Sequence, residues 1–389
     1  MIDRHSHPEQ DERFAVLIAG GGVAGLEAAF ALRELAGDRV AITVMSDSDD
    51  FVYRPLSIGE PFNRSHAEHY GLAGLTAAAG AQLVRGTLAH VDVEQRVART
   101  SDGAEMSYDA LVVATGATAE PAFEHATTFD DARIDELLHG LVQDVEEGYT
   151  HTMAIVLPAP LPWPFPGYEL ALMASERAWD MQTDLDITLL TPERMPLEVF
   201  GNQVSRSVSE LLAERRIKVV TSAYCEIPKS QQVVVHPGGR TFHANRIVAL
   251  PRLHGPAVDG LTSDGGGFLP VNEFGQVRDA SCVWAAGDAT DVPIKLGGVA
   301  AQLADVVAHS IAEVAGASVQ PQPFSPYVEG VLMTGGSPRY LRAQPAWPDP
   351  AGQSVFANVP PELSPPKIAA HYLAAHLTRE SASIAGGSA

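Results

Sequence analysis

The sequence predicts an α/β protein with two Rossmann-like, doubly wound domains, of which the second splits the first, and a small C-terminal region. Apolar β-branched runs alternate with helix-prone segments twice along the chain, a G-x-G-x-x-G pattern follows the first run, and a second strand ends in glycine near residue 285. The length of 389 residues suits two or three domains. The expected ranges are a disordered tail at 1–12, the first domain at 13–118 and 246–322, the second domain at 119–245, and the C-terminal region at 323–389.

The first domain begins with a strand, a tight turn and a helix. Phe14 to Ala19 is a short apolar run with a β-branched centre, and the glycines after it lead into an Ala/Leu-rich segment that extends to Leu35. A second strand is expected at 40–45, after a connection whose length suits a right-handed βαβ crossover. Polar, proline-containing sequence then runs to about Arg64, and further strands are expected at 82–85, 90–93 and 110–114.

The second domain repeats this order of elements. It opens with an acidic, helix-prone stretch at 120–150, and the sequence then predicts strand 152–157, helix 168–180, strand 186–190, a helix that ends at Glu214, and strand 218–221. From Ile247 the chain is apolar and strand-like again and leads to the glycine signal near 285. We therefore expect the chain to return to the first domain at residue 246.

Charge and composition exclude several functions. The formal net charge of −22 repels phosphate backbones and anionic lipid headgroups, so no nucleic-acid partner is expected. No apolar run is long enough for a membrane-spanning helix. Cys225 and Cys282 form no C-x-x-C pair, and no carboxylate or cysteine completes a site beside His66 and His69, so no metal is predicted. Two cysteines and a polar, acidic N-terminus lead us to expect a cytoplasmic protein.

The first glycine pattern carries the strongest functional signal. Gly20, Gly22 and Gly25 stand between the first strand and the first helix, which is the context that a dinucleotide-binding turn requires. Gly20 permits the tight turn, Gly22 lets a pyrophosphate approach the backbone, and Gly25 allows the helix to pack closely on the strand. The helix N-terminus at Val23 and Ala24 supplies N–H donors for the phosphates. The plain alternative is a glycine-rich turn without a ligand.

Two further strand ends carry candidate ligand contacts. Ser46 occupies the position where an acidic residue typically binds ribose hydroxyls and Asp47 follows it, so both are candidates, with a solvated turn as the alternative for Asp47. Gly287 and Asp288 end a later strand and precede a helix that opens at Gly297. An aspartate there could hydrogen-bond the ribityl chain of a flavin, and the helix N-terminus would favour negative charge on the reduced ring.

The motifs together resemble the FAD-dependent pyridine nucleotide-disulfide oxidoreductase superfamily, and within it the branch of sulfide:quinone oxidoreductase and type II NADH dehydrogenase. The matching pieces appear in the expected order over most of the chain: the first glycine pattern, Ala114-Thr115-Gly116, Gly287-Asp288 and Lys295-Leu296-Gly297-Gly298. The resemblance implies that the cofactor is FAD.

The same resemblance assigns roles to individual residues. It implies that Thr115 and Gly116, with Ala114, close over the FAD, and that Asp288 holds the ribityl or pyrophosphate portion. Gly298 and Val299 would lie near the pyrimidine edge of the flavin. Arg54 and Pro55 resemble the loop that passes near the isoalloxazine ring.

The sequence departs from the family in two places. Where nicotinamide-using members carry a second glycine pattern, this chain has a turn with five prolines, which leave few N–H donors for a pyrophosphate: Pro158, Pro160, Pro162, Pro164 and Pro166. This turn resembles the sulfide:quinone branch, in which the loop is no standard nucleotide cradle. That branch oxidises sulfide with two cysteines beside the flavin, and neither Cys225 nor Cys282 falls in a matching position. The electron donor is therefore left open.

Two polar residues are candidates for proton handling. Glu169 follows the proline-rich turn and Lys295 stands near the expected flavin edge; a helix-start carboxylate and a surface lysine are the alternatives. In the resembled branch, the C-terminal region makes membrane contact and the quinone pocket. Here Ile368, Tyr372, Leu373 and Leu377 recur at helical spacing after Lys367, so either weak peripheral membrane contact or a helix that covers the domain interface is expected.

The expected function is that of an FAD-dependent oxidoreductase that passes electrons through the flavin to a small acceptor, with a quinone as the first candidate. An NAD(P)H-dependent flavin reductase and a non-catalytic FAD-binding protein are the two alternatives. The partners would be a small-molecule electron donor and acceptor. The sequence predicts no oligomeric state.

Overall fold

The first lobe is built on a five-stranded parallel sheet. In a computed structural model, which describes residues 13–344, 354–357 and 370–386, the strand order is β20-β9-β1-β2-β5. Even-numbered residues of β1 such as Ile18 face the helices α1 and α6, whereas Leu17 and Ala19 face a small antiparallel sheet, so both faces are covered. The bounds are β1 (Phe14–Ala19), β2 (Val40–Ser46), β5 (Gln82–Arg85), β9 (Ala110–Val113), β20 (Val283–Ala285), α1 (Val23–Ala36) and α6 (Gly297–Val314), with β6 (Leu88–Asp92), β7 (Val97–Thr100) and β8 (Glu105–Ser107) in the small sheet.

The polar segment after β2 is more structured than the sequence indicates. It forms the hairpin β3 (Asp50–Tyr53) and β4 (Glu68–Gly71), with the 3-10 helix η2 (Arg54–Phe62) between the strands and helix α2 (Leu72–Ala78) after them. Ile58 and Phe62 of η2 are buried in the core of the second lobe. This segment therefore joins the two lobes. Two shorter turns of 3-10 helix are η1 (Gly37–Arg39) and η4 (Gly287–Ala289).

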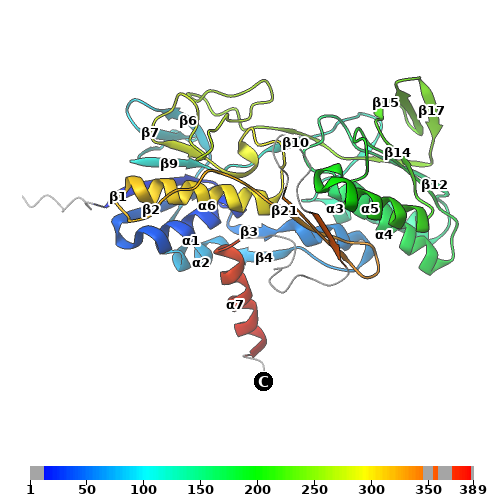
Figure 1. Cartoon of the computed structure of the whole chain (residues 1–389), viewed down its shortest axis with the longest axis horizontal. Helices are drawn as coiled ribbons and strands as arrows, with labels where there is room; N and C mark the ends of the chain where they lie inside the picture. The colour runs from blue at the N-terminus through cyan, green and yellow to red at the C-terminus, as the bar shows by residue number, and fades with distance from the viewer. Residues whose placement is uncertain (1–12, 345–353, 358–369, 387–389) are drawn as a thin grey trace, which may run out of the picture.

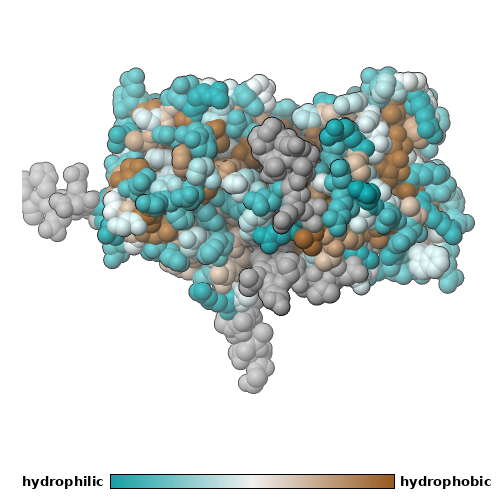
Figure 2. All heavy atoms as spheres, in the orientation of Figure 1, coloured by the Kyte–Doolittle hydropathy of each residue, from teal (hydrophilic) through white to brown (hydrophobic). Residues whose placement is uncertain are grey.

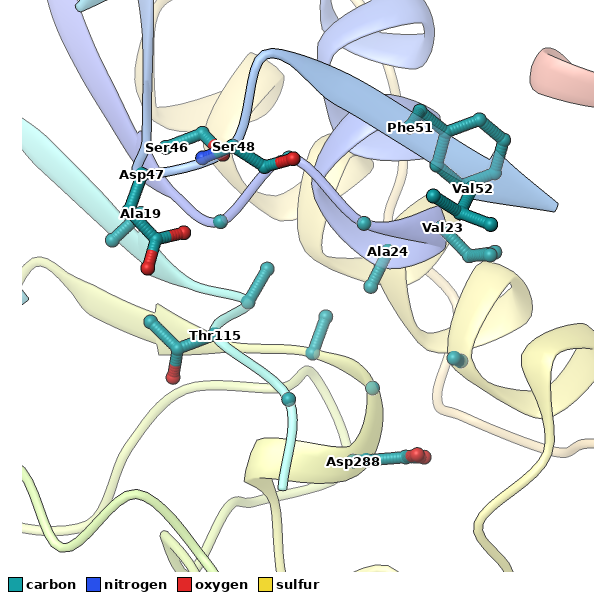
Figure 3. Close-up of a pocket in the computed structure, with 18 of the residues that line it drawn as sticks. Ala19, Val23, Ala24, Ser46, Asp47, Ser48, Phe51, Val52, Thr115 and Asp288 are labelled. Atoms are coloured by element: carbon teal, nitrogen blue, oxygen red, sulfur yellow. The ribbon is translucent and has the colours of Figure 1, made fainter. Parts of the chain in front are cut away.

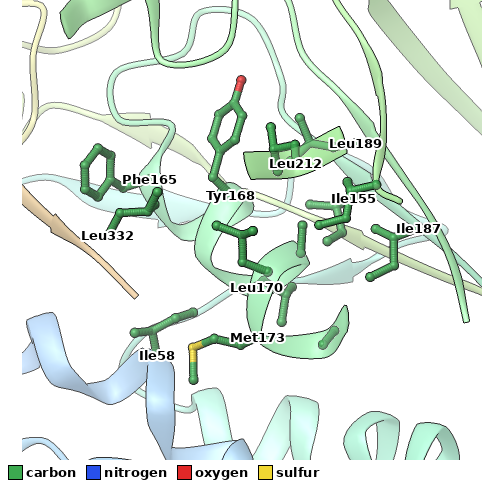
Figure 4. Packing of buried hydrophobic residues seen from close by; sticks show 14 of the residues in the cluster. Ile58, Ile155, Phe165, Tyr168, Leu170, Met173, Ile187, Leu189, Leu212 and Leu332 are labelled. Carbon is green, nitrogen blue, oxygen red and sulfur yellow. The ribbon is translucent and has the colours of Figure 1, made fainter. Parts of the chain in front are cut away.

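The second lobe contains another five-stranded parallel sheet, in the order β11-β18-β12-β13-β14. Its core packs α4 against the sheet, with Tyr168, Leu170 and Met173 turned toward Ile155 and Ile187 (Figure 4). The bounds are β11 (Thr127–Thr128), β12 (Thr152–Val156), β13 (Asp186–Leu190), β14 (Lys218–Val220), β18 (Arg246–Ala249), α3 (Ile134–Glu146), α4 (Phe165–Met181), η3 (Glu198–Phe200) and α5 (Gly201–Glu214), with a three-stranded antiparallel sheet of β15 (Tyr224–Lys229), β16 (Gln232–His236) and β17 (Arg240–His243).

One expected boundary is wrong. Strand β18 pairs with β12 in the second sheet, so the chain has not returned to the first lobe at residue 246. The return follows β18, where β19 (Arg252–His254) pairs antiparallel with β10 (Thr118–Glu120). Both passages of the chain between the lobes therefore run side by side in one short ribbon.

The C-terminal region spans the two lobes. Strands β21 (Val328–Leu332), β22 (Arg339–Ala343) and β23 (Ser354–Ala357) form an antiparallel sheet, and β21 contacts both α4 and α6. Figure 1 shows the two lobes side by side, with β21 between them and α7 (Leu373–Gly386) extending from the body beside α1. The expected tail at 1–12 and the candidates Lys367 and Ile368 lie outside the described residues.

The α/β class with two Rossmann-like sheets is thus confirmed. Hydrophilic residues cover most of the face in Figure 2, and hydrophobic residues appear there in smaller groups. Within the described part of the chain, no helix has both the length and the apolar character needed to cross a membrane.

Candidate functional site

A cavity of about 540 Å³ opens at the carboxyl ends of the first sheet's strands. This edge is where parallel sheets bind ligands. Segments that are far apart in the sequence meet here, and Figure 3 shows Val23, Asp47, Thr115 and Asp288 around one open space. The expected residues that line this first cavity are Gly20, Gly22, Val23, Ala24, Ser46, Asp47, Arg54, Pro55, Ala114, Thr115, Gly116, Gly287 and Asp288.

The three glycines of the turn have different surroundings. Gly20 has a φ of +121°, and a Cβ on it would lie 2.1 Å from the Ala114 carbonyl oxygen. A Cβ on Gly25 would lie 1.9 Å from the Gly20 carbonyl oxygen, so Gly25 packs against the turn and does not line the cavity. A Cβ on Gly22 would meet nothing within 4 Å, because it would project into the cavity. The fold requires Gly20 and Gly25, whereas the open cavity beside Gly22 fits a close ligand.

The N-terminus of α1 is available to an anion. Its N-cap is Gly22, its first turn holds no acidic residue, and no side chain among the described residues caps it. The amides of Val23 to Gly25 have no partner within the helix, because such partners begin with the Leu26 N–H that donates to the Gly22 carbonyl at 2.9 Å. Uncapped amides that follow a turn of glycines, which have no Cβ atoms, fit the pyrophosphate of a dinucleotide.

At the end of β2 the geometry separates Ser46 from Asp47. The Ser46 Oγ is buried and accepts the Ser48 N–H at 3.2 Å, so it is occupied within its own turn. Asp47 is exposed, and Figure 3 shows its carboxylate directed into the open space. Asp47 is therefore the better placed of the two for ribose hydroxyls.

The far end of the first cavity gathers charged groups from three elements. Arg54 of η2 pairs with Asp131 at 3.1 Å, and Asp288 of η4 lies beside them. Burial raises the pKa of Asp288, and the positive charge of Lys295 opposes that shift. Gly297 and Ala300 of α6 line the cavity here, whereas the expected Gly298 and Val299 do not, because Val299 is turned into the core of the second lobe.

Two smaller cavities meet the first one at Arg54, Asp131 and Asp288. The second cavity, of about 230 Å³, is mostly apolar and lies between η2, α4 and β21; its lining includes Ile58, Phe129, Trp163, Phe165, Leu296, Val331, Ser57, Glu169 and Lys295. The third cavity, of about 380 Å³, lies between the proline-rich turn and the two passages between the lobes, and its lining includes Ala117, Leu161, Pro162, Leu250, Leu253 and again Lys295.

Lys295 is not a surface lysine. Its side chain is 7% exposed, its Nζ donates to the Thr290 carbonyl, and the ammonium stands 4.0 Å from the centre of the Phe268 ring. Desolvation lowers the pKa of Lys295 to about 8, although the nearby carboxylates, first that of Asp288, act against the shift. A buried lysine with a pKa of about 8 holds its proton at neutral pH and can still release it to a bound acceptor.

Glu169 is tied into the fold. It is 3% exposed, and one of its carboxylate oxygens accepts the Met333 N–H at 2.9 Å, which anchors the end of β21 to α4. It lines the second cavity. The structure therefore gives Glu169 an anchoring contact at the cavity wall.

The second sheet does not repeat the open helix N-terminus of the first. Pro166 in the first turn of α4 has no N–H, and the Gly167 N–H donates to the Pro164 carbonyl at 3.1 Å. At the end of β13, Glu193 is buried and accepts hydrogen bonds from the hydroxyls of Tyr168 at 2.7 Å and Thr191 at 2.8 Å. Burial raises the pKa of Glu193 to about 7. The groups that would bind a nucleotide here are already paired with the protein.

Several lining residues escaped the sequence analysis. Gly86 and Thr87 follow β5, a strand that was predicted, so the rule that ligands contact the ends of parallel strands could have found them. Phe51 and Val52 come from the unexpected strand β3. No sequence motif around Asp131 indicates a binding residue, because Asp131 reaches the cavity through the packing of the two lobes.

Both cysteines lie away from the cavities. Cys282 precedes β20, at the edge of the sheet opposite to the first cavity, and Cys225 belongs to β15 in the small sheet of the second lobe. Burial raises the pKa of Cys225 to about 12. Among the described residues, no cysteine lines any of the three cavities.

Comparison with known proteins agrees with this architecture. Residues 14–142 match the family model for pyridine nucleotide-disulphide oxidoreductases. A sulfide-quinone reductase of Aquifex aeolicus (strain VF5) is 25% identical over 334 residues, 76% of this chain and 75% of that protein. The solved sulfide:quinone oxidoreductase of Aquifex aeolicus superposes with a TM-score of 0.78 at 21% identity, covering 94% of this chain and 90% of that one.

A ferredoxin reductase from Rhodopseudomonas palustris superposes with a TM-score of 0.64 at 19% identity, covering 85% of this chain and 83% of that one. The likeness of these solved structures concerns the fold. The family match covers the glycine turn, the end of β2 and the Ala114 to Gly116 strand end, which line the first cavity. The match over residues 14–142 thus relates this part of the chain to the pyridine nucleotide-disulphide oxidoreductases, and it identifies the protein as an FAD-dependent oxidoreductase whose first cavity fits the dinucleotide.

Proposed function

We propose that this protein oxidises a small donor through its FAD and passes the electrons to a quinone bound in the second cavity. Bound FAD supplies a ring system that accepts and releases two electrons. The single observation that carries the proposal is the apolar, aromatic second cavity, which meets the first cavity at Arg54, Asp288 and Gly297. A flat apolar acceptor with two carbonyl oxygens suits such walls, with Ser57 and Lys295 among the polar groups that could contact those oxygens.

The relatives support the same acceptor. The Aquifex aeolicus protein is a sulfide-quinone reductase, and its similarity extends over 76% of this chain. The second cavity is bounded on one side by Gly330 and Val331 of β21, so the C-terminal region contributes to it. In this proposal, the aromatic wall of Trp163 and Phe165, whose ring centres are 4.5 Å apart, holds the ring of the acceptor and excludes water.

The positions of the cysteines bear on the donor. A cysteine pair beside the flavin is the route by which the resembled branch oxidises sulfide, and here both described cysteines lie away from the cavities. We therefore propose a donor that reduces the flavin directly from the third cavity. Its walls are largely apolar, and its carboxylates stand beside the cations Arg54 and Lys295, so an uncharged donor fits it best.

The test is anaerobic stopped-flow mixing of the photoreduced protein with a short-chain ubiquinone. Recovery of the oxidised flavin absorbance should saturate with quinone concentration and exceed the rate for free reduced FAD at least tenfold. Val331→Trp fills the second cavity and should lower this rate by about tenfold or more, because the quinone loses its place. Val355→Trp is the matched control, since Val355 is 52% exposed on β23.

Equal rates for Val331→Trp and the unsubstituted protein would place the acceptor outside the second cavity. Recovery no faster than that of free reduced FAD would instead favour the non-catalytic FAD-binding alternative. Flavin content measured before mixing separates both outcomes from simple loss of cofactor.

A further inference from the structure

Lysine is rare in this chain. Only four of its 26 lysine and arginine residues are lysines. Lys218 and Lys229 are exposed, whereas Lys295 is 7% exposed. Arginine stays charged at every physiological pH, but the charge of a lysine can be tuned by its surroundings. Lys295 is therefore a buried cation beside the cavities whose charge can change with pH, unlike that of Arg54.

The Lys295 ammonium is held from two sides. Its Nζ donates to the Thr290 carbonyl, and the Phe268 ring lies 4.0 Å away, within the range of a cation–π contact. These contacts direct the ammonium to the place where the second and third cavities adjoin.

The loop that carries Phe268 is itself braced. One carboxylate oxygen of Asp264 accepts the N–H groups of Gly266 and Phe268, both at 2.8 Å, and the Asp264 N–H donates to the Phe268 carbonyl at 2.8 Å. This bracing fixes the backbone of a half-buried residue whose ring faces the ammonium. These hydrogen bonds therefore fix the position of the Phe268 ring next to the ammonium.

We propose that Phe268 is a positioning residue, which holds Lys295 in place as the proton donor to the acceptor in the second cavity. This inference rests on the proposed function. A quinone that gains two electrons also takes up two protons to become a hydroquinone. One Nζ–H bond of Lys295 breaks as an O–H bond forms on the acceptor, and the neutral amine then regains a proton from water, which also supplies the second proton.

The charges around Lys295 set the pH range of this step. Asp288, Asp291 and Asp264 face it and favour the ammonium, but desolvation is larger and brings the pKa of Lys295 down to about 8. Across the adjoining cavities stand Arg54, Asp130, Asp131 and Glu169. Proton donation is therefore available below about pH 8 and is lost as the pH rises through that value.

The direct test is NMR titration of the FAD-loaded protein with lysine labelled by ¹⁵N at Nζ. With four lysines the spectrum holds four signals, and Lys295→Met assigns the one of interest. In Phe268→Leu the ring no longer stabilises the ammonium while the site stays apolar, so the pKa of Lys295 should fall by about half a unit to one unit. Phe268→Tyr keeps an aromatic face and should leave this pKa unchanged.

The pH dependence of quinone reduction gives a second readout. The fall in rate at high pH should move to lower pH in Phe268→Leu by the same amount as the NMR titration. If the NMR titration moves and no quinone is reduced, the positioning of Lys295 stands and the proposed function is wrong. An unchanged Lys295 pKa in a flavin-loaded Phe268→Leu protein would overturn the positioning role.

Should Phe268→Leu fail to fold, fluorinated phenylalanines at position 268 replace it. Each added fluorine weakens the attraction of the ring for a cation with little change of shape. The pKa of Lys295 should then fall stepwise with fluorination. A constant pKa across the series would show that the ring has only a packing role.

Discussion

Gly22 and Gly25 belong to one turn but should fail in different ways when replaced. Gly22→Val should keep the fold, because a Cβ there meets open space, and should lose most of its FAD, because the side chain occupies the first cavity. Gly25→Ala places a Cβ 1.9 Å from the Gly20 carbonyl oxygen and should destabilise the protein by about 1–3 kcal/mol. Flavin content and thermal unfolding of the FAD-free proteins distinguish the two, and a fully yellow Gly22→Val protein would contradict the site.

Asp47 should contribute to FAD affinity in a way that its neighbours do not. Loss of a charged hydrogen bond to a ribose hydroxyl costs about 1.5–3 kcal/mol, so Asp47→Ala should weaken FAD binding about tenfold to a hundredfold. Asp49→Ala is the control, since Asp49 pairs with Arg85 on the surface and does not line the first cavity. Equal Kd values for the two variants, measured by quenching of FAD fluorescence, would remove Asp47 from the site.

The sequence predicts which residues line the site where the local backbone fixes their position. It fails where the direction of a side chain decides whether the residue reaches the cavity. The turn from Gly20 to Ala24 is placed by the strand and helix around it, so its position in the cavity follows from the pattern. Ser46 and Asp47 are adjacent in sequence, and only the hydrogen bond from Ser48 to Ser46 separates them. Gly298 and Val299 of α6 were predicted to lie at the flavin. The residues that line the cavity are their neighbours on either side, Gly297 and Ala300.

Among the elements, helix α7 is docked in an unusual manner. The buried carboxylate of Glu27 on α1 accepts the N–H groups of Tyr372 at 2.8 Å and Leu373 at 2.6 Å, at the N-terminus of α7. The buried carboxyl group of Asp305 on α6 neighbours that of Glu27. Leu373 and Leu377 complete the contact in a cluster with Phe51, which lines the first cavity. Docking of α7 therefore supports a wall of the FAD site.

This contact should weaken as the pH rises. Burial raises the pKa of Asp305 from its usual 3.8 to about 8, and that of Glu27 is raised as well. Acids with a raised pKa hold their protons more tightly in the docked state, so docking loses stability between about pH 4 and pH 8. Hydrogen exchange in the first turn of α7, corrected for intrinsic rates, should show more protection at pH 6 than at pH 9.

Asp305→Asn should reduce that pH dependence, because the pair then contains one acid and has no second charge to repel. Asp38→Asn, in the exposed turn η1 that follows α1, is the control and should leave the pH dependence unchanged. Protection that is the same at both pH values in the unsubstituted protein would show that the carboxyl pair does not govern docking.

The elements that the sequence misplaced depend on long-range pairing. Strand β18 was recognisable as an apolar run. Its neighbours in the sheet, β11 and β12, come much earlier in the sequence, so the sequence of β18 could not show which sheet it joins. Strands β3 and β4 pair across η2 in a segment whose prolines suggest a loop. Local periodicity found the other strands of both parallel sheets because they are buried in an ordinary α/β pattern, whereas the two-residue strand β11 is too short to give a periodic signal.

Over the whole molecule, the two lobes repeat one architecture with different binding capacity. In the first lobe, α1 offers uncapped amides to a cavity and Asp47 faces the same space. In the second lobe, Pro166 lacks an N–H, the Gly167 amide is occupied, and Tyr168 closes on Glu193. One lobe thus fits a dinucleotide, and the other has filled the equivalent crevice with its own side chains.

NADH and NADPH should therefore reduce the flavin poorly. In an anaerobic absorbance titration, millimolar NADH or NADPH should bleach the flavin bands no faster than it bleaches free FAD. The second lobe offers neither free amides for a pyrophosphate nor an unpaired carboxylate for a ribose. Sulfide, added separately, tests reduction without a neighbouring cysteine pair. Photoreduction at the end confirms that the flavin can be reduced.

Rapid, saturable bleaching by micromolar NADH would mean that the Tyr168–Glu193 contact opens when NADH binds. In that case Tyr168→Phe should raise the affinity for NADH, because it frees the Glu193 carboxylate.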